Sequence, residues 1–418
     1  MNQRYRNKKK ILNDPVYGFI SISSELIFDL IEHRYFQRLR RIKQLGLTHL
    51  VYPGALHTRF HHAIGAMHLM QQAIEVLRSK GHEITKDEAL GTLTAILLHD
   101  IGHGPYSHTL EKSIVCSITH EELSLMFMQR LMKEFDGMPE TGISIFNNSY
   151  HKKFLHQLVS SQLDMDRLDY LKRDSFFTGV SEGVINTDRI IKMLDMHDDN
   201  LVVEAKGIYS IEKFIIARRL MYWQVYLHKT VLSAEQMLVR IIRRARYLAR
   251  NGTPLFATSP LRPFLEQELY MEDFKENPDI LDTFARLDDF DIFTSIKEWV
   301  HHPDKVLSNL CYSLVNRQLF RTEIMNKPIP PGAVENVKKA IAREMGISME
   351  EAGYFVFTDV ARNSAYDPAN DKINIFYRDG SIVDISEASD QLNIDVLSKI
   401  VTKYFICFPK AFASAFKI

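Results

Sequence analysis

The segment AILLHDIGHGPYSH, residues 95–108, constrains the fold of this chain more than any other stretch. Its four leading apolar residues predict the end of a buried helix, and the glycines and proline that follow predict a tight turn that stops the helix. His99 and Asp100 stand at this helix end, where an unpaired imidazole or carboxylate is costly to bury. One histidine there would be typical of a capped helix end. Three histidines and an aspartate within ten residues favour a functional site instead.

Helical periodicity dominates the chain up to about residue 305. Apolar residues recur at helical spacing through 25–46 and 63–81, where Gly46 and Gly81 predict C-terminal stops. A longer helix is predicted from 211 to about 250. Three basic residues of that helix are interpreted as a solvated face: Arg243, Arg244 and Arg246.

The pattern changes after about residue 305. Residues 354–360 and 372–385 have the apolar and aromatic composition of strands, and an Asp-Gly pair predicts a hairpin turn within the second segment. We therefore predict a mostly α protein with an all-helical domain over residues 1–305 and a small α+β domain over residues 306–418.

The composition narrows the setting in which the chain works. Its 52 Lys and Arg residues balance its 52 Asp and Glu residues, so a net charge of zero argues against nucleic-acid binding by bulk electrostatics. Three widely spaced cysteines predict no disulfide framework and no cysteine-rich zinc site. No uninterrupted apolar run approaches the roughly 18 residues of a membrane span. We expect a soluble, cytoplasmic protein with no role at a membrane.

Polar residues in two other segments complete a metal-binding pattern. His62 lies upstream in HTRFHHAIGAMH, and Asp166 lies downstream in SSQLDMDRLDYLKRD. Together with His99 and Asp100 they offer two imidazoles and two carboxylates, which suit a catalytic divalent ion such as Mn, Fe, Ni, Zn or Mg. The downstream helix is also compatible with ordinary salt bridges. We favour that simpler interpretation for two of its acids taken singly, Asp164 and Asp169.

The order and spacing of these segments resemble the HD-domain phosphohydrolase superfamily: RFHH, then HDIGHGPYSH, then DMDRLDYLKRD. Four further segments are similar to one subgroup, the deoxynucleoside triphosphate triphosphohydrolases, which include the SAM-and-HD-domain enzymes of vertebrates: NDPVYGFI, FQRLRRIKQLG, VYPGALHTRFHHAIG and VYLHK. The resemblance covers about the first 250 residues and includes no SAM domain. It implies a helical HD core at about residues 50–175, with the four residues named above as metal ligands.

The resemblance also implies which residues contact the substrate phosphates. His103, His108 and His120 would line them, with His108 as the proton donor and Glu111 as the carboxylate that orients it. Three arginines would hold the phosphates, with the α-phosphate bound by the first: Arg59, Arg167 and Arg218. The family has lysine where Arg167 stands and aspartate where Glu111 stands, so the reach of both side chains differs here.

A second implied group of residues recognises the sugar. Gln44, Tyr170 and Asp174 would bind the 3′-hydroxyl. Leu45 and Tyr226 would crowd the 2′ position and so exclude ribonucleotides.

The resembling family also binds a nucleotide near the N-terminus, which promotes assembly. The matching positions here are Lys10, Ile11, Asp14, Glu32, Arg38 and Arg40, with Glu32 in place of the family's aspartate. A surface helix with i,i+4 pairing is the simpler interpretation of Glu32. The resemblance thus implies a nucleotide activator, a homo-oligomer (dimer or tetramer), one divalent ion in the HD site and Mg²⁺ on the nucleotide phosphates.

The predicted activity is metal-dependent hydrolysis of a dNTP to a deoxynucleoside and inorganic triphosphate. Attack of water at the α-phosphorus requires an activated water, neutralisation of an anionic substrate and protonation of a leaving oxygen. A metal can activate the water, arginines and histidines can neutralise the substrate, and an imidazole of near-neutral pKa can protonate the leaving oxygen.

Three alternatives compete with this prediction. An HD-type phosphohydrolase or phosphodiesterase acting on another nucleotide has the same metal ligands. A (p)ppGpp hydrolase is disfavoured, because IGHG follows the His-Asp pair where an acidic pair is typical. A nucleotide-sensing or nucleic-acid-binding regulator with a vestigial site could use the basic start RYRNKKK and the arginines at 243–246, although an intact ligand set would be unusual in a vestige.

Overall fold

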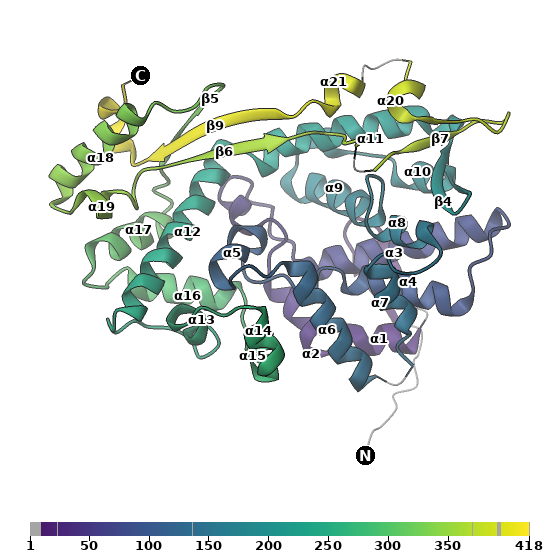
Figure 1. The fold of residues 1–418 in the computed structure, drawn as a ribbon, viewed down its shortest axis with the longest axis horizontal. Helices are drawn as coiled ribbons and strands as arrows, with labels where there is room; N and C mark the ends of the chain where they lie inside the picture. Colours follow the sequence, from purple (N-terminus) through teal and green to yellow (C-terminus); the bar gives the residue numbers. More distant parts are fainter. Residues whose placement is uncertain (1–9, 23, 136, 370, 391–393, 418) are drawn as a thin grey trace.

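The computed structural model describes residues 10–22, 24–135, 137–369, 371–390 and 394–417, and most of them are helical (Figure 1). The prediction of a mostly α fold with a small C-terminal α+β region is confirmed. Within the described residues, no helix combines the length and the apolar composition that crossing a membrane would require.

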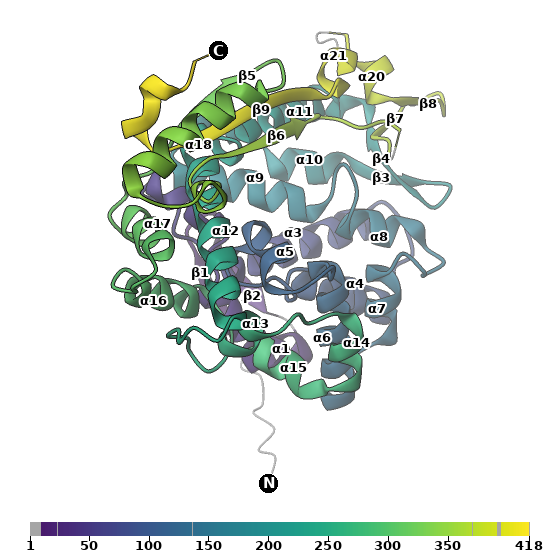
Figure 2. The same cartoon turned by 60° about the vertical axis from the view of Figure 1, so that its left-hand side comes forward.

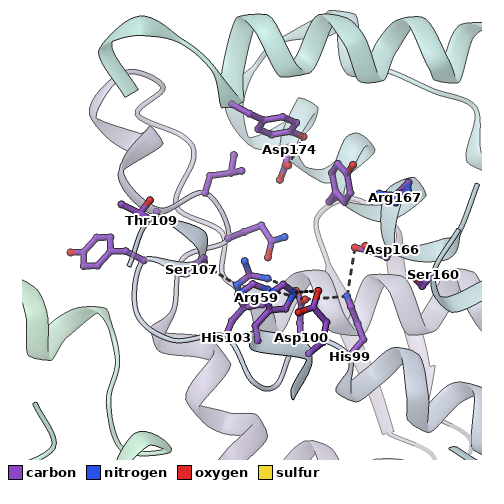
Figure 3. A pocket seen from close by; sticks show the side chains of 18 of the residues that line it. Arg59, His99, Asp100, His103, Ser107, Thr109, Ser160, Asp166, Arg167 and Asp174 are labelled. Atoms are coloured by element: carbon purple, nitrogen blue, oxygen red, sulfur yellow. Dashed lines mark hydrogen bonds and ion pairs between the residues drawn. The ribbon is translucent and has the colours of Figure 1, made fainter. Parts of the chain in front are cut away.

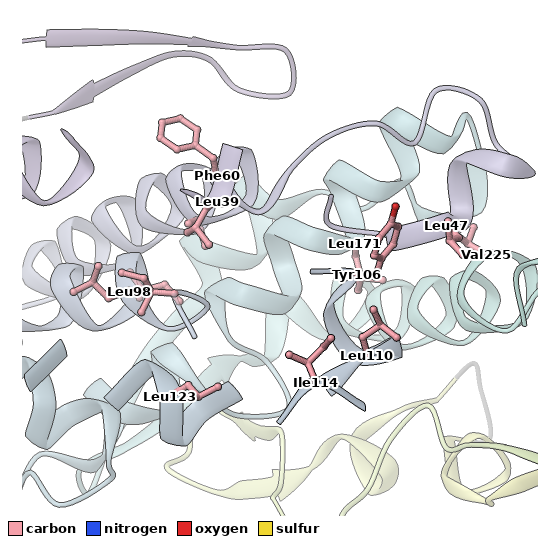
Figure 4. Packing of buried hydrophobic residues seen from close by; sticks show 14 of the residues in the cluster. Leu39, Leu47, Phe60, Leu98, Tyr106, Leu110, Ile114, Leu123, Leu171 and Val225 are labelled. Carbon is pink, nitrogen blue, oxygen red and sulfur yellow. The ribbon is translucent and has the colours of Figure 1, made fainter. Parts of the chain in front are cut away.

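Three helices form the centre of the helical region: α3 (Arg59–Ser79), α4 (Lys86–Leu98) and α9 (Met165–Thr178). α3 packs against both of the others, and Leu98 and Leu171 belong to the continuous apolar core around them (Figure 4). Gly65 permits the close approach of α3 to α9, because a Cβ there would collide with the side chain of Asp169. The helices that carry the metal-binding pattern therefore lie side by side.

The other large helices surround this centre (Figures 1 and 2). Beside α4 lie α6 (His120–Glu134), α7 (Glu140–Phe146) and α8 (Lys153–Val159). Beside α3 and α9 lie α10 (Thr187–Met193) and α11 (Ile208–Met221). The long α12 (Lys229–Arg250) packs against α13 (Arg262–Glu266) and α17 (Lys305–Val315). Smaller helices complete this part: α5 (Glu111–Ile114), α14 (Met271–Glu276), α15 (Pro278–Phe284) and α16 (Asp289–Trp299).

The prediction of one helix over residues 25–46 is wrong. The segment contains α1 (Glu25–Glu32), α2 (Arg34–Gln37) and the 3-10 helix η1 (Arg38–Arg41). His33 breaks the helix, because its backbone is extended (φ −66°, ψ 142°) and its ring accepts a hydrogen bond from the backbone N–H of Tyr35. In contrast, α3 ends as predicted, two residues before Gly81, whose φ is +93°.

The prediction of one helix from 211 to about 250 is also wrong. α11 passes into a π-helical turn, η6 (Tyr222–Tyr226), and His228 then adopts an extended backbone that caps α12. Arg244 does not lie on a solvated face. It is 7% exposed and pairs with Asp304 and, at 3.1 Å, with Glu351. Arg244 can therefore lie on the buried, apolar side of α12, because Asp304 and Glu351 neutralise its charge.

Within the described residues, three small sheets accompany the helices. β1 (Lys10–Asp14) and β2 (Gly18–Ile22) form an antiparallel hairpin. A second sheet has the order β3 (Leu194–His197), β4 (Asn200–Glu204), β7 (Asn374–Phe376) and β8 (Ile382–Asp384). The third has the order β5 (Arg321–Met325), β9 (Val401–Phe408) and β6 (Phe357–Asn363). The first 305 residues are thus not all helical, since β1 to β4 lie within them.

The C-terminal region is joined to the helical region through one of these sheets. β7 pairs in parallel with β4, so strands from both sides of residue 305 share a sheet. The hairpin predicted at Asp379-Gly380 is confirmed, with β7 and β8 antiparallel and Gly380 at φ +87°. The helices of this region are α18 (Pro331–Met345), α19 (Met349–Ala352), α20 (Ile385–Ala388) and α21 (Ile394–Ser398). The two-domain division at residue 305 stays a prediction.

Candidate functional site

The four predicted metal ligands converge at the ends of three helices. His62 comes from the first turn of α3, His99 caps α4 with Asp100 directly after it, and Asp166 comes from the first turn of α9. The Nε2 atom of His62 lies 3.0 Å from Asp166 Oδ1 and 3.4 Å from His99 Nε2. His99 Nε2 lies 3.3 Å from Asp100 Oδ1 (Figure 3). Their assignment as ligands stays a prediction, which this geometry supports.

The donor atoms fit a divalent ion. Ligands held about 2.0 to 2.2 Å from one ion lie roughly 3 to 3.6 Å from one another, which matches the separations above. The Nδ1–H of His62 donates to Asp169 Oδ2 at 2.7 Å, and the Nδ1–H of His99 donates to the Ile96 carbonyl at 2.6 Å. Both rings therefore present an unprotonated Nε2 to the centre of the cluster when neutral, as metal-binding histidines do.

The pKa shifts of His62 and Asp166 indicate that the cluster favours a positive charge. Burial lowers the pKa of His62, but hydrogen bonds with Asp166 and Asp169 outweigh it and raise that pKa to about 10. Burial raises the pKa of Asp166, but the two histidines hold it well below its usual range. A bound cation would take the place of the proton that His62 otherwise retains.

A buried ionic network supports His62 from behind. Asp169, which we had interpreted as an ordinary salt-bridge residue, accepts from His62 and from two nitrogens of Arg173 at 2.9 Å. Arg173 also donates to Asp14 Oδ2 at 2.7 Å. The β1–β2 hairpin is thereby connected to a predicted metal ligand through three consecutive polar contacts. Asp164 behaves as predicted, because it caps α9 and pairs with Arg167.

A second group of polar residues lies beside Asp100. Arg59 donates to Asp100 Oδ2 and, at 2.8 Å, to Ser107 Oγ. Burial alone would raise the pKa of Asp100, but Arg59 and the neighbouring histidines hold it well below its usual range. His103 lies 3.3 Å from Asp100 Oδ1 and stacks on His120 with ring centroids 3.9 Å apart. Burial and Arg59 lower the pKa of His103 well below its usual value, so its ring is neutral.

The predicted acid and its orienting carboxylate are only partly described. The side chain of His108 lies outside the described part of the structure, although its backbone belongs to the 3-10 helix η3 (Ser107–Thr109). Glu111 accepts from His120 Nδ1 at 2.8 Å and from the His120 backbone N–H at 2.8 Å. Glu111 therefore orients His120, and its relation to His108 stays a prediction.

A cavity of about 920 Å³ opens over these groups. Residues predicted from the sequence line it from all sides: Gln44, Leu45, Arg59, His99, Asp100, His103, His120, Asp166, Arg167, Tyr170, Asp174 and Tyr226. Arg218 is not part of this lining, since it donates to Gln162 Oε1 at 2.9 Å. The volume is ample for a nucleotide-sized ligand.

The predicted sugar-binding residues form a connected group on one wall. The phenol of Tyr226 donates to Asp174 Oδ2 at 2.7 Å, and burial together with Asp174 keeps the pKa of Tyr226 well above its usual value. The other oxygen of Asp174 lies 2.7 Å from His57 Nε2, and the buried His57 ring stacks on Phe177. The Oε1 atom of Gln44 is buried with no partner within the described residues, so it is available to a ligand.

The predicted allosteric residues are not all brought together. Lys10 and Ile11 are exposed on β1, and Glu32 and Arg40 are exposed at the ends of α1 and η1. Asp14 is buried in its contact with Arg173, and Arg38 is fully buried, where it donates to the Ile101 carbonyl at 2.6 Å. Burial lowers the pKa of Arg38 to about 9. The nucleotide-binding role of this group stays a prediction.

Several residues of the site were not predicted from the sequence. His57, Tyr222 and Glu235 contact the cavity or its wall. Glu235 lies on α12, where it is a single acid within the apolar run VLSAEQMLV. Burial raises its pKa to about 7, and a hydrogen bond from Thr109 partly offsets this shift. An isolated acid in an apolar run could have identified Glu235 as a site residue from the sequence. No comparable pattern marks His57 or Tyr222.

This fold and site define a class of metal-dependent hydrolase, and similarity to known proteins agrees with that class. Residues 185–252 match the HD-associated region family. A crystal structure of a phosphohydrolase from Bacteroides thetaiotaomicron is 54% identical, with a TM-score of 0.93, over 96% of this chain and 100% of that chain. The uncharacterized protein YwfO of Bacillus subtilis is 32% identical over 97% of this chain and 93% of its own length.

A third relative is the deoxynucleoside triphosphate triphosphohydrolase SAMHD1 homolog of Dictyostelium discoideum. It is 29% identical over 76% of this chain, which spans 60% of that protein. The chain belongs to the HD-domain phosphohydrolase superfamily, as the sequence motifs predicted. Membership implies a hydrolase that uses a divalent metal ion.

Proposed function

We propose that this protein is a metal-dependent dNTP triphosphohydrolase, which converts a dNTP to a deoxynucleoside and inorganic triphosphate. The observation that carries the proposal is one cavity with the His62–Asp166 cluster on one side and the Tyr226–Asp174 pair on another wall. The first suits phosphate chemistry, and the second offers hydrogen-bond partners for a sugar hydroxyl. The name of the Dictyostelium relative and the residue-by-residue resemblance add support.

A divalent ion bound by His62, His99, Asp100 and Asp166 would supply Lewis acidity and an activated water. Arg59 and Arg167 bind and neutralise the phosphates, and the neutral ring of His103 can donate a hydrogen bond to a phosphate oxygen. The oxygen of water bonds to the α-phosphorus while the bond between that phosphorus and O5′ breaks. His108 delivers the proton to O5′, and the triphosphate leaves with the water's oxygen.

In this proposal the wall that contains Tyr226 and Asp174 selects a deoxyribose. Gln44, Tyr170 and Asp174, which line the cavity, would bind the 3′-hydroxyl, and Leu45 and the ring of Tyr226 would crowd the 2′ position. Buried polar groups left unpaired cost about 1 to 3 kcal/mol each, so a dideoxy substrate binds less well.

The decisive experiment resolves the products. Purified protein is incubated with dGTP, GTP and deoxyguanosine monophosphate in the presence of Mn²⁺ or Mg²⁺, with and without a second dNTP as activator, and the His62→Ala variant serves as the inactive control. We expect deoxyguanosine and inorganic triphosphate from dGTP, and little turnover of GTP. Equal rates for dGTP and GTP, or release of phosphate from the monophosphate, would contradict the proposal and favour the broader phosphohydrolase.

A further inference from the structure

His57 is a buried histidine behind the cavity wall that contains Tyr226 and Asp174. It lies in the segment before α3 and is 1% exposed. Its ring stacks on Phe177, with ring centroids 4.5 Å apart and an interplanar angle of 18°. The lining of the cavity includes Asp174 but not His57. A ligand in the cavity therefore contacts Asp174, and His57 can act on that ligand only through another residue.

Both carboxylate oxygens of Asp174 have a hydrogen-bonding partner. The Nε2 atom of His57 lies 2.7 Å from Oδ1, and the phenol of Tyr226 donates to Oδ2 at 2.7 Å. His57 precedes α3, Tyr226 ends η6, and Asp174 itself lies in α9. Because partners from two separate segments contact its two oxygens, the plane of this carboxylate is fixed. A carboxylate has about four acceptor positions, so two remain for a ligand.

The surroundings of the His57 ring indicate what the imidazole contributes. A carboxylate oxygen faces Nε2, so Nε2 carries a proton and acts as the donor. Nδ1 is buried and has no partner within the described residues. A phenylalanine would fill the same space against Phe177 without the cost of burying polar atoms. The contribution of the imidazole is therefore its hydrogen bond to Asp174.

We propose that His57 is a positioning residue whose Nε2–H holds Asp174 Oδ1 and thereby directs the remaining acceptor positions of that carboxylate toward the 3′-hydroxyl of the substrate. Without this donor the carboxylate can rotate about its Cβ–Cγ bond. The loss then falls on recognition of the 3′-hydroxyl and leaves the phosphate contacts intact. The inference rests on the proposed dNTP substrate and deepens it, because it names the residue that makes Asp174 selective for a 3′-hydroxyl.

The test compares kcat/KM for dGTP and for 2′,3′-dideoxy-GTP, which differ only in the 3′-hydroxyl. His57→Phe keeps a ring against Phe177 and removes the donor. His57→Gln keeps an amide N–H that can reach Oδ1, whereas the shorter His57→Asn cannot reach it. The matched control is His82→Phe, because His82 Nε2 lies 2.5 Å from Asp195 Oδ1 in a second histidine–aspartate pair outside the cavity lining. Circular dichroism and metal content are measured for every variant.

We expect wild type to favour dGTP over the dideoxy substrate by roughly 10- to 100-fold, the size of a hydrogen bond to a charged acceptor. His57→Phe and His57→Asn should each reduce this ratio by about tenfold, because kcat/KM for dGTP falls while that for the dideoxy substrate changes little. His57→Gln should keep the ratio within about threefold of wild type, since a donor remains. The control should keep the wild-type ratio. If His57→Phe does not fold, the comparison of His57→Asn with His57→Gln carries the test.

A double variant shows whether His57 acts through Asp174. In the Asp174→Asn background the 3′-hydroxyl contact is already weakened, so adding His57→Phe should leave the ratio of dGTP to the dideoxy substrate unchanged. A further fall of that ratio in the double variant would mean that His57 acts by another route, and the inference would be overturned.

The remaining outcomes separate the inference from the proposed function. If folded, metal-loaded His57→Phe lowers both substrates equally, or leaves their ratio within about twofold of wild type, His57 has only a structural role and the inference fails. If wild type hydrolyses dGTP and the dideoxy substrate at equal rates, the inference fails while the dNTP triphosphohydrolase proposal stands. If wild type hydrolyses neither, the proposed function fails and the inference fails with it.

Discussion

Acidic side chains have different partners at two ends of the cavity. The metal end contains the predicted metal ligands, and the α12 end contains Glu235. At the metal end Asp166 pairs with His62, and Asp100 pairs with Arg59. At the α12 end Glu235 has the neutral hydroxyl of Thr109. The polar contacts of the metal end join charged groups, whereas Glu235 retains acceptor capacity beyond its contact with Thr109. We therefore expect substitutions at the metal end to remove activity and a substitution of Glu235 to change the pH dependence of stability.

The largest effect is expected from His62→Ala. Loss of one imidazole leaves an incomplete set of ligands, so metal content and turnover should both fall to background, while α3 remains folded through its packing on α4 and α9. Metal content is measured by elemental analysis, and folding by circular dichroism. Full metal occupancy with normal turnover would contradict the assignment of the metal end.

A smaller effect at the same end is expected from Asp169→Asn, because Asp169 orients His62 without being a predicted ligand. Changes in such supporting residues typically lower metal affinity or activity about 10- to 100-fold. Excess metal should therefore restore much of the activity, which a titration with Mn²⁺ measures. Since Arg173 also loses a charged partner, the unfolding free energy should be measured in parallel. An unchanged metal affinity would remove Asp169 from this network.

Tyr226 lies between the two ends, and two substitutions can separate the role of its hydroxyl from the role of its ring. Tyr226→Phe removes the donor to Asp174 but keeps the ring, so kcat/KM for dGTP should fall roughly tenfold while the preference over GTP persists. Tyr226→Ala also opens space at C2′, so the gap between dGTP and GTP should narrow. Identical dGTP-to-GTP ratios in both variants would show that the ring does not exclude the 2′-hydroxyl.

The smallest effect is on stability and concerns the α12 end. The folded-state pKa of Glu235 is raised to about 7, so the folded protein holds this proton more tightly than the unfolded chain. Stability is lost as pH rises from about 4.5 through 7 and stays lower above that range. Glu235→Gln should therefore stabilise the protein by about 1 to 2 kcal/mol at pH 8, and less as pH falls toward 5. Urea unfolding measures this difference, and an equal gain at both pH values would contradict the buried charge.

The resemblance to the superfamily rests on histidines and aspartates that occur in a fixed order along the chain. The sequence alone was therefore sufficient to find them. The end of α4 at His99 and the stop at Gly81 followed from apolar periodicity and glycine, both of which act locally. The hairpin at Asp379-Gly380 followed from the conformational freedom of one glycine. The predicted metal ligands were proposed because His and Asp at the end of a buried helix are costly without a partner.

Contacts between segments far apart in the chain were decided only by the tertiary structure. Arg244 is buried because Asp304 and Glu351 reach it, and nothing within α12 encodes that. The helix predicted over residues 25–46 breaks at His33, although the apolar pattern continues. Arg38, which follows the break, is buried because it reaches the carbonyl of the distant Ile101. The sequence by itself determined the chemistry of the site, since residue types and local spacing specify it. The wall that contains Glu235 required α12 to pack against the 3-10 helix η2 (Gly46–Leu50) and η3, and such packing depends on residues far apart in the chain.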